Sequence, residues 1–316
     1  MSAPSVMTFY RFAALTDLEA LRTHVHQAAT ALNLRGTVLL AEEGINGTLC
    51  GAREALEALR SELLRDARLA GMPFKFSTAN ADNPVFHRLK VRIKPEIVSF
   101  GQPHLRPGER TGEHVDAARW NALLEDPEVV VIDTRNRYEV AIGTFPGALD
   151  PGTRTFREFP EFVRSALDPQ RNRRVAMFCT GGIRCEKASA FLLEQGFAAV
   201  YQLDGGILRY LETVDPADNR WQGDCFVFDQ RVSVTTALAE GAHSQCYACR
   251  RALTAADRAS AQFQEGISCP HCFEEVDAER RRRFAERRRQ VLLAEARGAR
   301  HIGAGEAAGQ RRSGSR

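Results

Sequence analysis

The chain has 316 residues, which is too long for one ordinary core and is enough for two or three domains. Its hydrophobic fraction of 44% and charged fraction of 26% are typical of globular proteins, and eight cysteines are too few for a disulfide scaffold. The first fifteen residues lack a secretory signal, and no apolar run is long enough for a membrane span. We therefore expect a cytoplasmic protein without a membrane partner.

Residues 1–100 alternate strand-like and helix-like patterns. Two helices that each follow a strand predict a ferredoxin-like (acylphosphatase-like) βαββαβ domain. The turn EEGIN offers Gly44 and Asn46 for positive φ and predicts a hairpin. The expected helices are 18–33 and 53–65, and the expected strands and extended segments are 7–12, 36–42, 45–51, 74–78 and 88–100.

The middle of the chain predicts a second, α/β domain with a parallel sheet. Residues 101–124 begin rich in proline, glycine and charge and then regain helical spacing, so we expect a linker and a helix. Helical patterns separate the apolar runs of residues 125–219, which predicts right-handed crossovers between parallel strands. These expected strands are 129–133, 174–178 and 199–203.

Cys179 directly follows the strand 174–178, at the sheet edge where such domains bind ligands. A cysteine is nucleophilic as the thiolate, which backbone N–H groups, a helix N-terminus and a cation stabilise. Arg184 supplies the cation, and the glycine-rich loop predicts inward-facing amides from Thr180, Gly181, Gly182 and Ile183. The alternative is a buried structural cysteine beside a tight turn. The order strand, cysteine, glycines, arginine and helix favours a reactive thiol.

Residues 220–290 carry two C-x2-C pairs and an arginine-rich helix. Two such pairs predict a zinc-ribbon-like site with one structural Zn, and the alternative is a redox pair. Because four thiolates leave no open coordination position, we do not expect zinc to perform a reaction. The end of the chain, GAGEAAGQRRSGSR, lacks core-forming residues, and residues 291–316 are expected to be a disordered basic tail. The expected ligands are Cys246, Cys249, Cys269 and Cys272.

Two basic stretches are candidates for RNA contact. In RLKVRIK the basic residues alternate with apolar ones, so a strand would place them on one face, along which phosphates can bind. The arginine-rich helix can lie along an RNA backbone. The alternative for both is an ordinary solvated surface. The candidates are Arg88, Lys90, Arg92 and Lys94 in the strand, and Arg280, Arg281, Arg282, Arg283, Arg287 and Arg288 in the helix.

The C-x-x-G-x-R loop, VIDTRNRYEVAIGTFPGAL (131–149) and GFAAVYQLDGGILRYLE (196–212) resemble the rhodanese family. The resemblance implies that Cys179 carries a persulfide held by Arg184 and the loop amides, with Asp133 and Arg135 in supporting roles. A loop of this length suits one sulfur atom rather than a phosphate group. Cys185 either resolves an oxidised Cys179 or packs in the helix.

The segments LLAEEGINGTLCG, NPVFHRLKVRIKPEIVSFG and CTGGIRCEKASAFL, with the cysteine pairs, resemble the bacterial tRNA uridine hydroxylase family. That resemblance implies oxygen-dependent hydroxylation of the wobble uridine (position 34) in the tRNA anticodon loop to 5-hydroxyuridine, with O2 as co-substrate. The sequence shows no flavin, haem or iron-binding motif and does not identify the electron donor. The alternatives are a sulfurtransferase that uses a cysteine persulfide and a non-catalytic RNA-binding or sulfur-sensing module.

Overall fold

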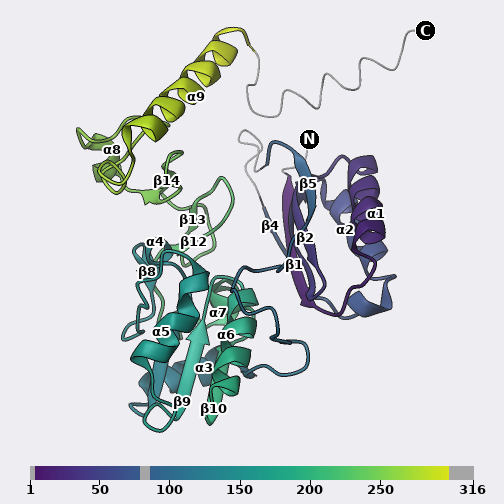
Figure 1. The fold of residues 1–316 in the computed structure, drawn as a ribbon, viewed down its shortest axis with the longest axis vertical. Coiled ribbons are helices and arrows are strands. Elements are labelled where there is room, and N and C mark those ends of the chain that lie inside the picture. The colour runs from purple at the N-terminus through teal and green to yellow at the C-terminus, as the bar shows by residue number, and fades with distance from the viewer. Residues whose placement is uncertain (1–3, 79–85, 299–316) are drawn as a thin grey trace.

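The structure is a computed structural model that describes residues 4–78 and 86–298. Figure 1 shows an N-terminal domain in purple, a central domain in teal, and a C-terminal segment in green and yellow that ends in the long helix α9. Within the described ranges, no helix combines the length and the apolar character needed to cross a bilayer.

The N-terminal domain is a five-stranded sheet with two helices on one face (Figure 1). Neighbouring strands are antiparallel except β2 and β5, which are parallel. The order of the first four strands confirms the ferredoxin-like prediction, and β5 adds a fifth strand at the edge. In sheet order the strands are β4 (Phe74–Thr78), β1 (Ser5–Phe12), β3 (Gly44–Gly51), β2 (Arg35–Ala41) and β5 (Leu89–Ile93), and the helices are α1 (Leu18–Ala31), α2 (Arg53–Leu63) and the short η1 (Ala67–Leu69).

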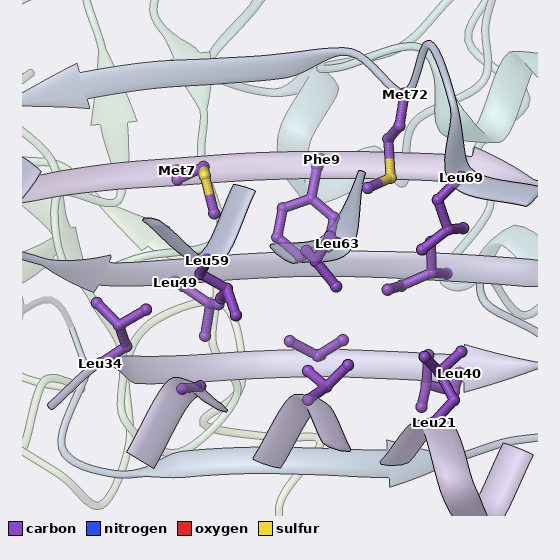
Figure 2. Close-up of a cluster of buried hydrophobic side chains, with 14 of the residues drawn as sticks. Met7, Phe9, Leu21, Leu34, Leu40, Leu49, Leu59, Leu63, Leu69 and Met72 are labelled. Atoms are coloured by element: carbon purple, nitrogen blue, oxygen red, sulfur yellow. The ribbon is translucent and has the colours of Figure 1, made fainter. Parts of the chain in front are cut away.

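Alternation along the strands separates a buried face from an outer face. Met7 and Phe9 of β1 face the helices and pack in the apolar core, together with leucines of both helices such as Leu21 and Leu59 (Figure 2). Tyr10, the next residue, therefore lies on the outer face. By the same rule Lys75 of β4 faces outward, because its neighbours Phe74 and Phe76 pack against the core.

The EEGIN segment forms the predicted hairpin between β2 and β3, but one of its two expected turn residues is misplaced. Gly44 has a φ of +149°. Asn46 lies within β3, pairs with Leu39 and Tyr10, and donates from its side chain to the Ile97 carbonyl at 3.1 Å. The expectation of positive φ at Asn46 was therefore wrong, since the tight turn is made by Glu42 and Glu43.

The central domain has a parallel four-stranded sheet in the order β6, β10, β9, β7. The three expected strands form where predicted, as β7 (Val129–Asp133), β9 (Arg174–Phe178) and β10 (Ala199–Leu203). The fourth strand, β6 (Glu113–Val115), lies in the segment interpreted as a linker, and its three residues are too few to give a periodic signal. The helices are α3 (Ala117–Glu125), α4 (Arg137–Val140), η2 (Phe156–Glu158), α5 (Phe159–Ala166), α6 (Ile183–Glu194), α7 (Gly206–Thr213) and η3 (Pro216–Asp218).

The C-terminal segment contains short paired strands and two helices. Helix α9 continues to Ala296, so the prediction that a disordered tail starts at 291 was wrong for residues 291–296. The sequence VLLAEA consists mostly of strong helix formers, which explains the continuation. The predicted tail at 299–316 lies outside the described residues. The elements are β8 (Gly143–Thr144) with β11 (Gln222–Gly223), β12 (Cys225–Phe226) with β13 (Ser233–Val234), β14 (Ser244–Gln245) with β15 (Ala252–Leu253), α8 (Ala255–Ala259) and α9 (Ala278–Ala296).

Candidate active site

The Cys179 loop joins the end of β9 to the start of α6. Gly182 immediately precedes the helix with a φ of +101°, which strongly favours glycine, and its N–H donates to Cys179 Sγ at 3.1 Å. A loop amide therefore points inward at the sulfur, as predicted. The Cys179 side chain itself is only 1% exposed, so the sulfur is screened from solvent. A Cβ atom on Gly181 would meet nothing within 4 Å, which marks the open side of the loop.

Several groups act on the charge of the Cys179 sulfur. Burial raises the pKa of this thiol, but a hydrogen bond with Cys185, the Arg184 guanidinium and the backbone amides of residues 184 and 185 outweigh burial and bring the pKa below that of an ordinary cysteine. Burial and the neighbouring Cys179 charge raise the pKa of Cys185. These opposite directions favour Cys179 as the thiolate and Cys185 as the protonated donor.

The Arg184 guanidinium makes no hydrogen bond to the Cys179 sulfur. Its guanidinium makes a bidentate ion pair with Glu139, at 2.7 Å for both contacts, and a longer contact of 3.4 Å with the Thr180 hydroxyl. Both Arg184 and Glu139 are buried. In this state Arg184 acts on the sulfur through its charge and ties the loop to α4 through a salt bridge, and its contact with a persulfide stays a prediction.

Glu139 is the residue of this site that sequence reasoning missed. It lies within the rhodanese-like stretch 131–149, but Asn136 and Glu139 also form a capping box at the start of α4, with the Asn136 N–H donating to Glu139 at 3.1 Å. The capping-box spacing explains the glutamate without any partner from elsewhere in the fold. Only the folded structure shows that Arg184 reaches it.

Cys185 lies in the first turn of α6 and is fully buried. Besides its hydrogen bond with Cys179, its sulfur contacts the Thr134 hydroxyl at 3.6 Å. Thr134 also donates to the Phe178 carbonyl at 2.9 Å, which fixes the end of β7 against the end of β9. The two sulfurs that the sequence placed six residues apart therefore share one buried pocket.

Asp133 and Arg135 form a fully buried ion pair beside the loop. Arg135 donates to both carboxylate oxygens of Asp133, at 2.8 and 2.6 Å, and to the Gly143 carbonyl at 2.6 Å. The Thr144 hydroxyl, at the position where many rhodaneses carry histidine, donates to Asp133 at 3.1 Å. These contacts tie β7 to β8 and make no contact with the cysteine pair, which fits a supporting role.

The N-terminal domain is held against the Cys179 loop by a buried charge cluster. Lys187 of α6 is fully buried and pairs with Glu43 at 2.7 Å and with Glu96 at 2.6 Å. Glu43 is in the β2–β3 turn, and Glu96 lies between the N-terminal and central sheets. Since an unpaired buried charge is strongly unfavourable, this cluster fixes how the two domains meet.

The four predicted metal ligands converge at one point. The sulfur atoms of Cys246, Cys249, Cys269 and Cys272 lie within 4.8 Å of one another. Individual separations of 3.6, 3.7 and 4.0 Å compare with about 3.8 Å between sulfurs around a tetrahedral zinc whose Zn–S bonds are about 2.3 Å. This group can therefore bind a metal such as zinc, which would join the two C-x2-C turns.

The basic residues proposed for RNA contact divide into two groups. On β5, Leu89, Val91 and Ile93 pack against the core, and the basic residues take the other face as predicted. Lys90 is half-buried, and the exposed ones are Arg88, Arg92 and Lys94.

On α9, three of the predicted arginines hold the helix against the cysteine cluster. Arg281 donates to the Phe273 carbonyl, Arg287 donates to the Tyr247 carbonyl, and Arg288 pairs with Glu265. The remaining predicted arginines are exposed; they are Arg280, Arg282 and Arg283.

Comparison with known families agrees with the two larger domains. Residues 4–97 match the UPF0176 acylphosphatase-like domain, and residues 116–213 match the rhodanese-like domain. This is the architecture of the UPF0176 family. The rhodanese-like domain supports sulfurtransferase-like or related cysteine chemistry.

Solved structures resemble single parts of this chain. The rhodanese-like domain of an Anabaena sp. protein is 22% identical and covers 35% of this chain and 78% of that chain, with a TM-score of 0.29. A Rhodopseudomonas palustris protein of unknown function, described as a possible tyrosine phosphatase, is 24% identical over 33% of this chain and 83% of that chain, with a TM-score of 0.28. An acylphosphatase from Coxiella burnetii is 16% identical over 28% of this chain and 94% of that chain, with a TM-score of 0.22.

Proposed function

We propose that this protein hydroxylates the wobble uridine of tRNA to 5-hydroxyuridine with O2, and that Cys179 is the reactive residue. The observation that carries the proposal is the buried Cys179 and Cys185 pair, in which one sulfur is favoured as thiolate and the other as its hydrogen-bond donor. The resemblance to tRNA uridine hydroxylases, which extends to about residue 275, supplies the substrate. The rhodanese-type loop supplies the thiolate.

The cysteine pair meets a requirement of this reaction. Conversion of the uridine C5–H bond to C–OH by one atom of O2, with the other leaving as water, takes two electrons from uridine and two from a reductant. Cys179 as thiolate and Cys185 as thiol can supply those two electrons and one proton by closing to a disulfide, and the second proton needed to form water comes from solvent. A thiol reductant of the cell then restores the dithiol. This accounts for a second cysteine in contact with the first.

An exposed aromatic side chain lies beside the Arg184 guanidinium. Phe228 is 62% exposed, packs its ring on Phe226 at 5.2 Å between centroids, and lies 5.7 Å from the Arg184 guanidinium carbon. Single-stranded RNA bases are commonly bound by stacking on aromatic side chains. We propose that Phe228 stacks on a base of the anticodon loop. Phe228→Ala is then expected to weaken tRNA binding about tenfold, and an unchanged dissociation constant would contradict this assignment.

Nucleoside mass analysis of tRNA tests the proposed reaction. Cells that lack the protein are complemented with the wild type, with Cys179→Ser or with Cys50→Ser, a cysteine outside both clusters. We expect 5-hydroxyuridine with the wild type and Cys50→Ser and none with Cys179→Ser. Loss of a thionucleoside would instead favour sulfur transfer, and tRNA unchanged by deletion of the protein would favour a non-catalytic role.

Sulfur transfer is the second candidate, because one feature of the loop favours it. The Gly182 N–H already donates to the sulfur of Cys179, and a persulfide at this position would meet the same short ring of amides. In that reaction a donor passes sulfur to Cys179, and the terminal sulfur then moves to an acceptor nucleophile. Mass analysis of the purified protein for an added sulfur atom on Cys179 distinguishes this from the hydroxylation proposal.

A further inference from the structure

The outer face of the N-terminal sheet lies directly on the Cys179 loop. The Tyr10 hydroxyl of β1 donates to Glu186 of α6 at 3.3 Å. Lys75, on the neighbouring strand β4, donates from Nζ to the Gly205 carbonyl at 2.5 Å. Two side chains from a different domain therefore contact the elements on both sides of the cysteine loop.

Glycines at the contact points make this approach possible. A Cβ atom on Gly182 would lie 2.8 Å from the Tyr10 hydroxyl oxygen, and one on Gly205 would lie 2.9 Å from Lys75 Nζ. Gly205 packs against Gly182, and the Gly182 N–H donates to Cys179. Close contacts therefore lead from Lys75 Nζ through Gly205 and Gly182 to the reactive sulfur. A residue larger than glycine at either position would clash.

The charges around Cys179 show which cation is left to balance a thiolate. Arg184 is matched by Glu139, and Lys187 is matched by Glu43 and Glu96. Lys75 makes no ion pair with any carboxylate in residues 4–78 and 86–298. Burial lowers the pKa of Lys75, and the charge of Cys179 acts in the opposite direction. A buried anion is costly without a cation nearby, and Lys75 is the cation whose charge is not already matched.

We propose that Lys75 is the counter-cation of the Cys179 thiolate, so that the reactive site is built from both the N-terminal and the rhodanese domains. Lys75 is a positioning residue, since it acts through the sulfur. The inference rests on the proposed function only in taking the thiolate as the reactive form.

The other charged groups near the two partners are accounted for. Cys179 is faced by Tyr10, Cys185 and Arg184. Tyr10 does not supply a charge, because burial first and then the Glu186 carboxylate raise the pKa of its phenol. Lys75 is faced by Arg209, Asp204 and Glu212, of which Arg209 and Asp204 pair with each other at 3.4 Å. The charge of Glu212, like that of Cys179, raises the pKa of Lys75, but Glu212 forms no ion pair with it.

The test measures the thiolate of Cys179 in the full chain by ultraviolet absorbance across pH, with the signal of Cys179→Ser subtracted. Lys75→Gln keeps a donor for the Gly205 carbonyl and removes the charge, so the thiolate-to-thiol ratio at a fixed pH should fall about tenfold. Lys75→Arg keeps the charge and should titrate like the wild type. Lys90→Gln removes a lysine from the same sheet face, with basic neighbours only, and is the matched control.

An unchanged titration midpoint in folded Lys75→Gln would overturn the proposal. So would an equal shift in Lys75→Arg, because the hydrogen bond rather than the charge would then matter. Should the glutamine variant not fold, Lys75→Met keeps the aliphatic stem and carries the same expectation. The measurement needs neither tRNA nor O2, so failure of the hydroxylation assay leaves this result standing, and failure here leaves that assay unaffected.

Discussion

Two groups of cysteines in this chain show opposite ways of stabilising thiolates. In the Cys179 loop, backbone amides, a thiol donor and the Arg184 guanidinium favour a single sulfur anion. In the C-terminal segment, backbone amides also reach the sulfurs, as in the Cys269 N–H that donates to Cys272 Sγ at 3.4 Å, but four sulfurs converge within 4.8 Å, and their combined charge as thiolates needs a metal. The comparison teaches that the neighbours of a cysteine, rather than its burial, decide between reaction and metal binding, since both groups are largely buried.

The largest effect is expected from breaking the four-cysteine cluster. Cys272→Ser removes one ligand, and since structural zinc sites contribute about 10 kcal/mol or more to folding, the segment around α8 and the start of α9 should unfold. Metal analysis should find one zinc per chain in the wild type and none in the variant, and limited proteolysis should cut the segment. Cys179→Ser should keep its zinc, and loss of metal there would contradict the separation of the two groups.

The next largest effect is expected at the buried ion pair beside Cys179. Glu139→Ala leaves the Arg184 guanidinium buried without a partner, which typically costs about 3–5 kcal/mol. Chemical denaturation followed by a probe in the rhodanese domain measures this change. Glu57→Ala, which breaks an exposed pair with Arg53 and Arg60, is the control and should have no measurable effect. Equal stability of the two variants would show that Arg184 finds another partner.

A smaller effect is expected from the thiol that donates to Cys179. The Cys185 hydrogen bond helps to lower the pKa of Cys179, so the thiolate persists at pH values below those of an ordinary thiol. In Cys185→Ala the midpoint should move to higher pH, and the thiolate-to-thiol ratio at a fixed pH below the midpoint should fall about tenfold, the change that one pKa unit produces. Absorbance titration against Cys179→Ser checks this. A midpoint unchanged or moved to lower pH would contradict the assigned donor.

The sequence was sufficient to predict the features that depend on residues close together in the chain. Three strands of the central sheet, the converging cysteine pairs and the inward amide of Gly182 follow from runs, spacings and the need for positive φ. The sequence was insufficient to predict contacts between segments that are distant in the chain. The alternation along β4 predicts that Lys75 faces outward. It does not predict that this face packs on the Cys179 loop. Glu139 was hidden because its capping-box spacing explains it locally.

The smallest effect is expected from replacing an exposed arginine. As for the cysteines, the contacts of an arginine determine its role. Arg281 is tied to the Phe273 carbonyl and lies 4.5 Å over the Phe273 ring, whereas Arg92 on β5 is exposed on the face opposite the core. If tRNA binds that face, Arg92→Gln should lower affinity only slightly and reduce the slope of log binding constant against log salt by about one.

Arg281→Gln is the matched comparison, because it removes the same charge from a residue that is occupied within the protein. It should destabilise the contact between α9 and the cysteine cluster and leave the salt slope unchanged. Filter binding of tRNA across salt concentrations, together with thermal unfolding, separates the two variants. An unchanged slope for Arg92→Gln would remove β5 from the RNA surface, and a reduced slope for Arg281→Gln would show that an arginine already engaged in the fold can still release counterions from RNA.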